Sequence, residues 1–203
     1  MEEEKFYHIY NRANGFENLF ISDENYNYFL RQWAKHIEPV AQSYAYCLMP
    51  NHFHFLVKIR SEEEIRVNLN LTNSEKKPFG KFQTFQKLIS KQFSNFFSSY
   101  TQAFNKMHGR KGSLFIPNFK KKEITSENYL TNVIFYIHHN PVHHGFANTV
   151  SDWAHSSYPV FMSNKETKID RKYVYDWFGG LQNFKSFHTS TLYNLEQFEL
   201  ELT

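Results

Sequence analysis

The sequence predicts an α+β fold of the ferredoxin-like kind, in which helices pack on one face of an antiparallel sheet and a further core helix follows. Two segments with strand-like alternation are separated only by Met49-Pro50-Asn51, and so short a connection forces them to run antiparallel. Strand-like and helix-like periodicities follow one another as strand, helix, strand, strand, helix, strand, helix. This order favours a single sheet with a layer of helices.

The first half of the chain supplies three predicted strands and one helix. Aromatic and apolar side chains alternate in each strand, and they recur at helical spacing in the helix, which Pro39 follows. The predicted elements are strands at 5–11, 43–48 and 52–59 and a helix from Ser22 or Asp23 to about Ile37.

The second half supplies two helices and one strand. Phenylalanines recur at helical spacing in the first helix, whereas Pro117 lies inside the strand and argues for an edge position or a bulge. Pro141 and Gly145 should end the second helix. The predicted elements are a polar loop at 61–77, a helix over 82–104, a strand over 114–123 and a helix from Thr125 or Ser126 to about His139.

The length of 203 residues fits one domain with an appendage, so we expect a domain at 1–160 and a C-terminal extension at 161–203. The chain is 41% hydrophobic with 22 Phe, 13 Tyr and 3 Trp, which excludes a disordered protein. A single cysteine, Cys47, excludes an internal disulfide framework, and no apolar run is long enough to span a membrane. The acidic N-terminus is unlike a signal peptide, and we expect a cytoplasmic protein.

Charge is distributed unevenly, although the formal net charge is only +3. No Asp or Glu occurs from Lys76 to Lys122, and a polyanion such as a nucleic acid is attracted to such a local field. A solvated basic helix face is the alternative. The basic residues of this stretch are Lys76, Lys77, Lys81, Lys87, Lys91, Lys106, Arg110, Lys111, Lys120, Lys121 and Lys122.

The triplet His52-Phe53-His54 lies in the third predicted strand. Because side chains alternate along a strand, both imidazoles point to the same side, about 6.5–7 Å apart at their backbones, where they could share one cation. Phe53 and Phe55 should then point into the core. The triplet is a weak motif by itself, and by itself it favours two partly satisfied surface histidines over a metal site.

Tyr136 lies on the last predicted helix, about 100° from Ile137 and so at the edge of the apolar stripe. A tyrosine there is usually a boundary residue. A phenol, with its pKa near 10, can attack phosphorus only with help, such as a metal ion that polarises the phosphate. The side-chain oxygen of Asn140 could complete such a metal site, although Pro141 should push Asn140 away from helical geometry.

Several motifs, in order over about residues 5 to 160, resemble the HUH single-tyrosine transposases and most of all the REP-associated tyrosine transposases of the IS200-like group. They are Tyr7-His8-Ile9-Tyr10-Asn11-Arg12, Tyr44 to Val57 with His52-Phe53-His54, Gly112-Ser113-Leu114-Phe115 through Phe119-Lys120, Tyr136-Ile137-His138-His139-Asn140-Pro141-Val142, and Asp152-Trp153 through Ser156-Ser157-Tyr158.

The resemblance implies a nuclease that cuts and rejoins single-stranded or hairpin DNA through a 5′-phosphotyrosine intermediate, with bound protein associated with the nucleoid. Carried over by position, His52 and His54 would bind Mg²⁺ or Mn²⁺, Asn140 would be the third ligand, and Tyr136 the nucleophile. Single chains and homodimers both occur in the wider superfamily. The residues expected to bind DNA are Arg12, Lys81, Lys87, Lys91, Arg110, Lys111, Lys120, Lys121 and Lys122.

The chain departs from the family pattern at His143-His144, His155 and Asn118, which bears on DNA preference more than on chemistry. Two other functions stay open from the sequence. One is a domesticated relative that binds hairpin DNA or RNA without cutting it. The other is a structural zinc site at His138, His139, His143 and His144, whose spacing crosses a helix end.

Overall fold

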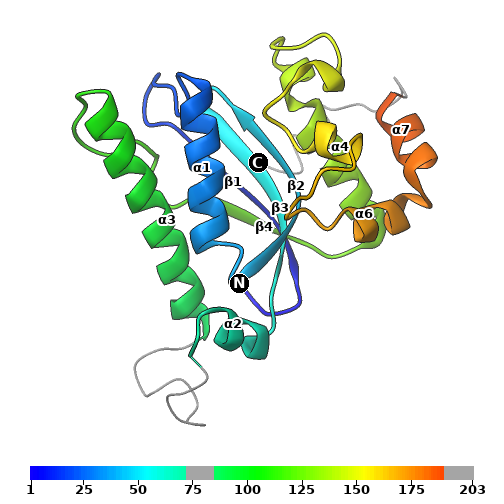
Figure 1. Cartoon of the computed structure of the whole chain (residues 1–203), viewed down its shortest axis with the longest axis horizontal. Helices are drawn as coiled ribbons and strands as arrows, with labels where there is room; N and C mark the ends of the chain where they lie inside the picture. The colour runs from blue at the N-terminus through cyan, green and yellow to red at the C-terminus, as the bar shows by residue number, and fades with distance from the viewer. Residues whose placement is uncertain (72–84, 190–203) are drawn as a thin grey trace.

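A four-stranded antiparallel sheet is the centre of the fold in the computed structural model, which describes residues 1–71 and 85–189 (Figure 1). The strand order is β2-β3-β1-β4, and the short hairpin between β2 and β3 is antiparallel as predicted. The strands are β1 (Phe6–Arg12), β2 (Ala41–Met49), β3 (His52–Ile59) and β4 (Lys120–Ile124).

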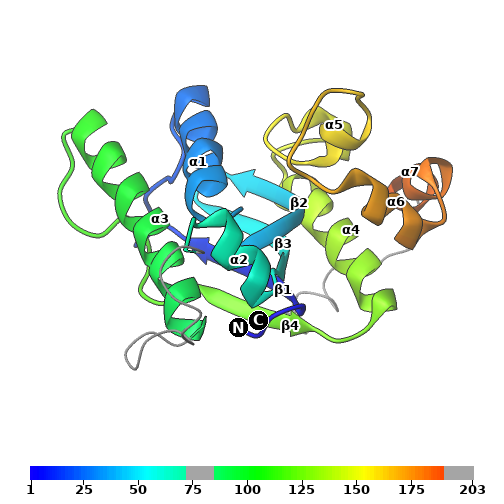
Figure 2. The ribbon, with the colours of Figure 1, turned by 60° about the horizontal axis from the view of Figure 1, so that its bottom comes forward.

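Helices cover the sheet on both sides, and the predicted α+β class is confirmed (Figure 2). The helices α1 (Asp23–His36) and α3 (Phe85–Met107) pack on one face, and α4 (Glu127–His143) packs on the other. The remaining helices are α2 (Glu62–Asn68), the 3₁₀ helix η1 (Val150–Asp152), α5 (Tyr158–Phe161), α6 (Arg171–Phe178) and α7 (Leu181–Thr189).

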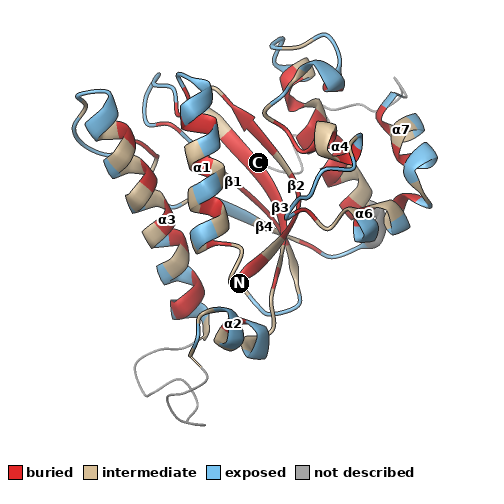
Figure 3. Cartoon of the chain, in the orientation of Figure 1, coloured by how far each residue is buried: buried red, intermediate tan, exposed pale blue. Residues whose placement is uncertain are grey.

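The alternation of side chains along β3 divides the protein into two cores. Phe53, Phe55 and Val57 point toward α1 and α3 and join an aromatic cluster in which Trp33 stacks on Phe55 with 3.6 Å between ring centroids. Leu56 points the other way, into the core beneath α4. The buried residues of β3 thus lie between two helical layers (Figure 3). His52 and His54 share the α4 side because their parity is that of Leu56.

The second core joins α4 to the chain that follows residue 160. Val133, Ile134 and Ile137 of α4 are fully buried, and Val174 of α6 and Phe184 of α7 pack into the same cluster. The described part of the predicted C-terminal extension therefore packs against the helix that carries Tyr136.

Three predictions about local structure are wrong. Residues 62–68 of the expected loop form α2, because Ser61 and Glu64 make a capping box and the acidic first turn suits a helix N-terminus. The Ser-x-x-Glu spacing was a sequence signal for this helix. The strand expected over 114–123 is confined to β4, since Pro117 and the left-handed Asn118 (φ 60°) interrupt it. Its edge position is as predicted.

The third error concerns the end of α4. The helix does not stop before Pro141 but continues to His143. The missing N–H of Pro141 removes one helical hydrogen bond, and only Val142 and His143 of the helix follow it. The long helix α3 agrees with the sequence from Phe85 onward, while residues 82–84 lie outside the described residues. Of the helices in residues 1–71 and 85–189, none is both long and apolar enough to cross a membrane.

A chain of hydrogen bonds between neutral side chains fastens α7 to α4. Ser157 Oγ lies 2.7 Å from His138 Nε2, His138 Nδ1 lies 2.9 Å from His188 Nε2, and His188 Nδ1 lies 2.8 Å from the Phe184 carbonyl. The pattern is satisfied when Ser157 donates to His138, His138 to His188, and His188 to Phe184. With His138 in this tautomer, a second proton on His188 would set its Nε2–H against the Nδ1–H of His138. Burial lowers the pKa of His188 to about 3 and holds the pKa of His138 well below its usual range.

We predict that His188→Gln reduces the dependence of folding stability on pH. The pKa of His188 is lower in the folded chain than the ordinary value near 6.5, so its contribution to stability is complete above that value and is lost as the pH falls toward 3. Between pH 6.5 and 5 one such histidine costs up to about 2 kcal/mol. Urea unfolding at pH 7.5 and pH 5 measures the difference. Substitution of the exposed His108 by Gln is the control, and an equal pH dependence in all three proteins would contradict the prediction.

Candidate active site on the α4 face of the sheet

The two histidines of the His-Phe-His triplet and the tyrosine of α4 come together at one place. Arg12 of β1 pairs with His52 of β3, and Tyr10 pairs with His54. The rings of His52 and His54 lie 5.2 Å apart between centroids, and the ring of Tyr136 meets His54 at 5.5 Å and 88°. Since α4 crosses this face of the sheet, a residue far along the sequence is brought to the strand histidines.

His8 of β1 contacts His54 directly, a role that the sequence analysis missed. His8 Nε2 lies 2.9 Å from His54 Nδ1, and both side chains are buried. When His54 Nδ1 donates this hydrogen bond, His54 Nε2 keeps its lone pair, which is the form that binds a cation. The alternation of side chains along β1 could have predicted this contact, because it places His8, Tyr10 and Arg12 on one face of the strand.

Asn140 stays in helical geometry despite Pro141 and lies one turn after Tyr136. Its Nδ2 donates to the Tyr136 carbonyl at 2.9 Å. Its Oδ1 is buried and makes no hydrogen bond with any described residue, although it is close enough to the ring of His52 to raise the pKa of that ring slightly. The Asn140 side chain therefore lies beside the ring of His52. An acceptor left in this state costs free energy unless something binds there.

The electrostatics of the site keep both strand histidines neutral. Burial lowers the pKa of His52 to about 4, helped by repulsion from His144 and Arg12. Burial is also the largest cause that holds the pKa of His54 well below its usual range, followed by repulsion from His8. At neutral pH both rings therefore present lone pairs rather than positive charge, which is the state that a metal ion requires.

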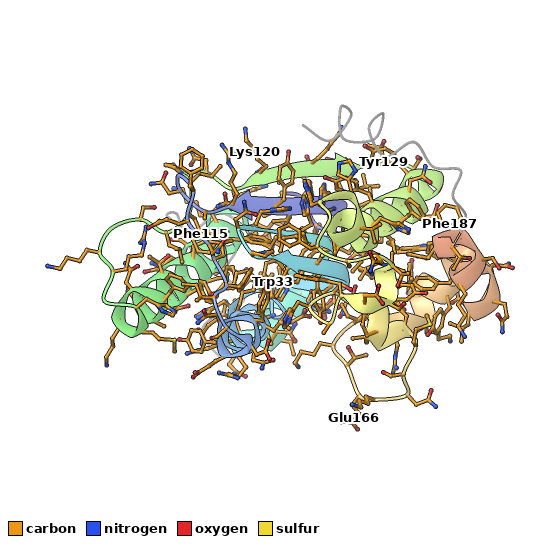
Figure 4. The ribbon with its side chains drawn as sticks, turned by 90° about the horizontal axis from the view of Figure 1, so that it is seen from above. Trp33, Phe115, Lys120, Tyr129, Glu166 and Phe187 are labelled. Atoms are coloured by element: carbon orange, nitrogen blue, oxygen red, sulfur yellow. The ribbon has the colours of Figure 1, made fainter. Side chains whose placement is uncertain are left out.

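These side chains line a pocket of about 400 Å³. Two cations line it, Arg12 at the end of β1 and Lys120 at the start of the edge strand β4. Figure 4 labels Lys120 beside that strand. His144 also lines it, with its ring 5.2 Å from that of His52. The pocket therefore joins basic groups at its rim to neutral imidazoles and a phenol inside. The lining residues are Tyr10, Asn11, Arg12, His52, Phe53, His54, Ile116, Lys120, Tyr136 and His144.

The other residues expected to bind DNA lie farther from this pocket. Lys122 shares the face of His8 by register and lies 5.9 Å from the centroid of the Tyr129 ring, whereas Lys121 is exposed on the opposite side of the edge strand. Arg110 forms an ion pair with Glu17 and so ties together two loops. Lys87, Lys91 and Lys111 are exposed. Lys81 lies outside the described residues.

The alternative structural zinc site finds no support in the geometry. Among the described residues no group of three or more His, Cys, Asp or Glu side chains could hold a metal ion. His138 is engaged with Ser157 and His188, while His144 faces the pocket beside His52. The rings of His143 and His144 lie 5.1 Å apart, but His138 is engaged elsewhere, so the four histidines do not share one site.

The comparisons with known proteins agree on one family. No family model matches the chain. The chain is 23% identical over 139 residues to a protein of Haemophilus influenzae named "Putative REP-associated tyrosine transposase", with 68% of this chain and 67% of that protein covered. Its fold is similar to the solved structure of a REP-associated tyrosine transposase bound to a REP hairpin, with a TM-score of 0.57, 15% identity, and 80% and 82% of the two chains covered. The resemblance inferred from the motifs is confirmed.

We predict that His54→Ala destabilises the fold more than His52→Ala does. Removal of the buried His54 ring leaves a cavity and takes the hydrogen-bond partner from His8 Nε2, which costs roughly 1–3 kcal/mol for the orphaned group alone. His52 is only half-buried and bonds to the exposed Asn51, so its loss should cost less than about 1 kcal/mol. Urea unfolding in the presence of EDTA compares the two variants without any metal. If the two variants lose the same free energy of unfolding, the hydrogen bond between His54 and His8 contributes nothing to stability.

Proposed function

We propose that this relative of the REP-associated tyrosine transposases cuts and rejoins single-stranded DNA beside a hairpin, with Tyr136 as the nucleophile. One observation carries the proposal, namely that Tyr136, His52 and His54 line one pocket together with Arg12 and Lys120, while Asn140 lies beside His52 although it is not one of the lining residues. The related structure is bound to a REP hairpin, which supports hairpin DNA as the partner of this chain.

The donors at the site fit a divalent cation. His52 and His54 offer neutral imidazole nitrogens, and Asn140 offers a buried amide oxygen without a hydrogen-bond partner among the described residues. Nitrogen and amide oxygen together suit Mn²⁺, and Mg²⁺ also accepts oxygen ligands with several waters retained. A cation held there would polarise a phosphate oxygen and stabilise the charge that develops in the transition state.

The protein groups would then carry out the transfer. Arg12 and Lys120 attract the phosphate to the pocket, and α4 holds the phenol of Tyr136 against the strand histidines. The Tyr136 oxygen forms a bond to phosphorus while the bond from phosphorus to the 3′ oxygen breaks. The phenol loses a proton and the leaving 3′ hydroxyl gains one, so the count of protons and of phosphoester bonds is unchanged. A 3′ hydroxyl can therefore reverse the step and join new ends.

Tyr136→Phe should abolish covalent capture and leave binding intact, because only the phenol oxygen is removed. A single-stranded hairpin oligonucleotide is incubated with Mn²⁺ or Mg²⁺, and a denaturing gel detects the protein–DNA adduct. Tyr129→Phe, on the same helix, is the matched control and should capture DNA as wild type does. If wild type binds the hairpin but never forms an adduct, the chain is a non-cleaving hairpin-binding relative and the proposal fails.

Mn²⁺ should stabilise the wild-type fold, since a ligand that binds only the folded state adds about 2.7 kcal/mol at a hundred times its dissociation constant. His52→Ala and Asn140→Leu should lose most of this gain because each removes one proposed donor. His108→Ala, at an exposed position, should keep it. Thermal unfolding with and without Mn²⁺ measures the effect, and gains that are equal in all four proteins would put the metal elsewhere.

A further inference from the structure

We propose that a second site, built around Glu38, binds a free amino acid with an apolar side chain. Two adjoining cavities, of about 170 Å³ and 520 Å³, have Glu38 in common and share Ala34, Thr167 and Lys168 as walls. We call them the inner and the outer part of the Glu38 site. No residue lines both this site and the active-site pocket, so the inference is independent of the proposed function.

The inner part of the Glu38 site is a small apolar cavity. Figure 4 labels Trp33, which lines it. A protein cavity of about 150 Å³ with apolar walls can hold one benzene molecule, so the inner part, at about 170 Å³, has room for one apolar side chain. Its apolar walls include Leu30, Trp33, Ala34, Phe55 and Ile169.

A largely buried carboxylate stands where the two parts meet. The side chain of Glu38 is 11% exposed, and burial raises its pKa although Ser43 and Arg60 act in the opposite direction. Its Oε1 accepts a hydrogen bond of 2.5 Å from Ser43 Oγ, which in turn accepts one of 3.0 Å from Trp33 Nε1. Its Oε2 accepts no hydrogen bond from any residue that the structure describes. A donor from a ligand would satisfy Oε2, and a positively charged donor would also compensate the buried charge.

Arg60 does not supply that donor, because its hydrogen bonds go elsewhere. Arg60 Nη2 lies 3.9 Å from Glu38 Oε2, which is too far for a hydrogen bond. Its Nε donates to the Glu38 carbonyl at 2.8 Å, and its Nη2 donates to Gln42 Oε1 at 2.7 Å. These bonds hold the guanidinium at the wall of the outer part, where the exposed Lys168 is a second cation. Gln42 Nε2 donates to the Lys168 carbonyl at 2.7 Å, so the loop that carries this lysine is tied to β2.

The two charges and the apolar cavity together select a zwitterion. The ammonium group of an amino acid would donate to Glu38 Oε2, and its carboxylate would lie against Lys168 and Arg60. Its side chain would fill the inner part. A carboxylic acid lacks the group that Glu38 requires, and an amine or the N-terminus of a peptide lacks the group that the two cations attract. Charge complementarity therefore favours a free amino acid over either half of it.

Isothermal titration calorimetry of the whole chain tests the ligand class. The probes are L-leucine, L-methionine and L-phenylalanine, and at least one of them should bind saturably. The probe that binds most tightly is then compared with its amide, which lacks the carboxylate, and with its deaminated acid, which lacks the ammonium group. Each of these two analogues should bind about tenfold more weakly or worse, because each loses one charged contact.

Glu38→Gln should weaken binding about tenfold or more, since the amide keeps the shape of the side chain and can still accept from Ser43 but carries no charge. Glu64→Gln is the matched control. Glu64 also lies against Arg60, at 3.5 Å, but it does not line the site, and glutamine preserves the capping box of α2. The control should bind within about twofold of wild type. Urea unfolding establishes that both variants are folded.

A second pair of variants tests the wall of the outer part. Lys168→Gln should weaken the amino acid about threefold or more while leaving its amide unchanged, because only the amino acid carries the carboxylate that this lysine attracts. Lys165→Gln makes the same change at an exposed position on the same loop, outside the site, and should alter neither affinity.

The indole N–H resonance of Trp33 reports whether the ligand reaches Glu38, because this N–H donates to the Ser43 hydroxyl that bonds to the carboxylate. The ligand should shift this resonance and leave those of Trp153 and Trp177 in place. The proposal is overturned if no probe binds at up to about 10 mM, or if the amide or the deaminated acid binds as tightly as the amino acid. It is also overturned if Glu38→Gln binds as tightly as Glu64→Gln.

Discussion

The arrangement of the site depends on the two-residue periodicity of β3. One strand has phenyl rings on one side, packed under α1 and α3, and imidazoles on the other, facing α4. A shift of the register by one residue would exchange the two faces and bury the histidines in the aromatic core. The stacking of Trp33 on Phe55 therefore contributes to the site although neither residue touches it, because it fixes which face the imidazoles occupy.

Burial of polar groups in the second core is the cost of this arrangement. His8, His54 and Asn140 are almost fully buried, and one nitrogen of His8 and the oxygen of Asn140 lack hydrogen-bond partners among the described residues. Such groups destabilise a fold, and proteins commonly retain them at functional sites. The surrounding core, formed by α4, α6 and α7, is apolar and well packed, so it can hold these side chains in place for chemistry.

Much of the fold could be predicted from the sequence, because periodicity reports the side of an element that is buried. It identified the sheet hairpin, the two long helices and the shared face of His52 and His54. The prediction failed at 62–68, because the charged composition favoured a loop although Ser61 and Glu64 form a capping box. It also failed at Pro141, because a proline usually ends a helix, whereas α4 continues for two more residues. The meeting of Tyr136 with His54 and the bond from His8 are contacts between distant segments, which only the three-dimensional packing reveals.

The short strand β4 places three consecutive lysines on an outer strand of the sheet. Open sheet edges invite pairing with other chains, and lysine is a common deterrent because stacking two such edges would bring like charges together. At the other edge, β2 is covered by the chain around Ser156 and Ser157, which bonds to its backbone. Lys120, Lys121 and Lys122 therefore protect the molecule from self-association as well as supplying positive charge. Replacement of these lysines by apolar residues would therefore leave this edge of the sheet open to pairing with other chains.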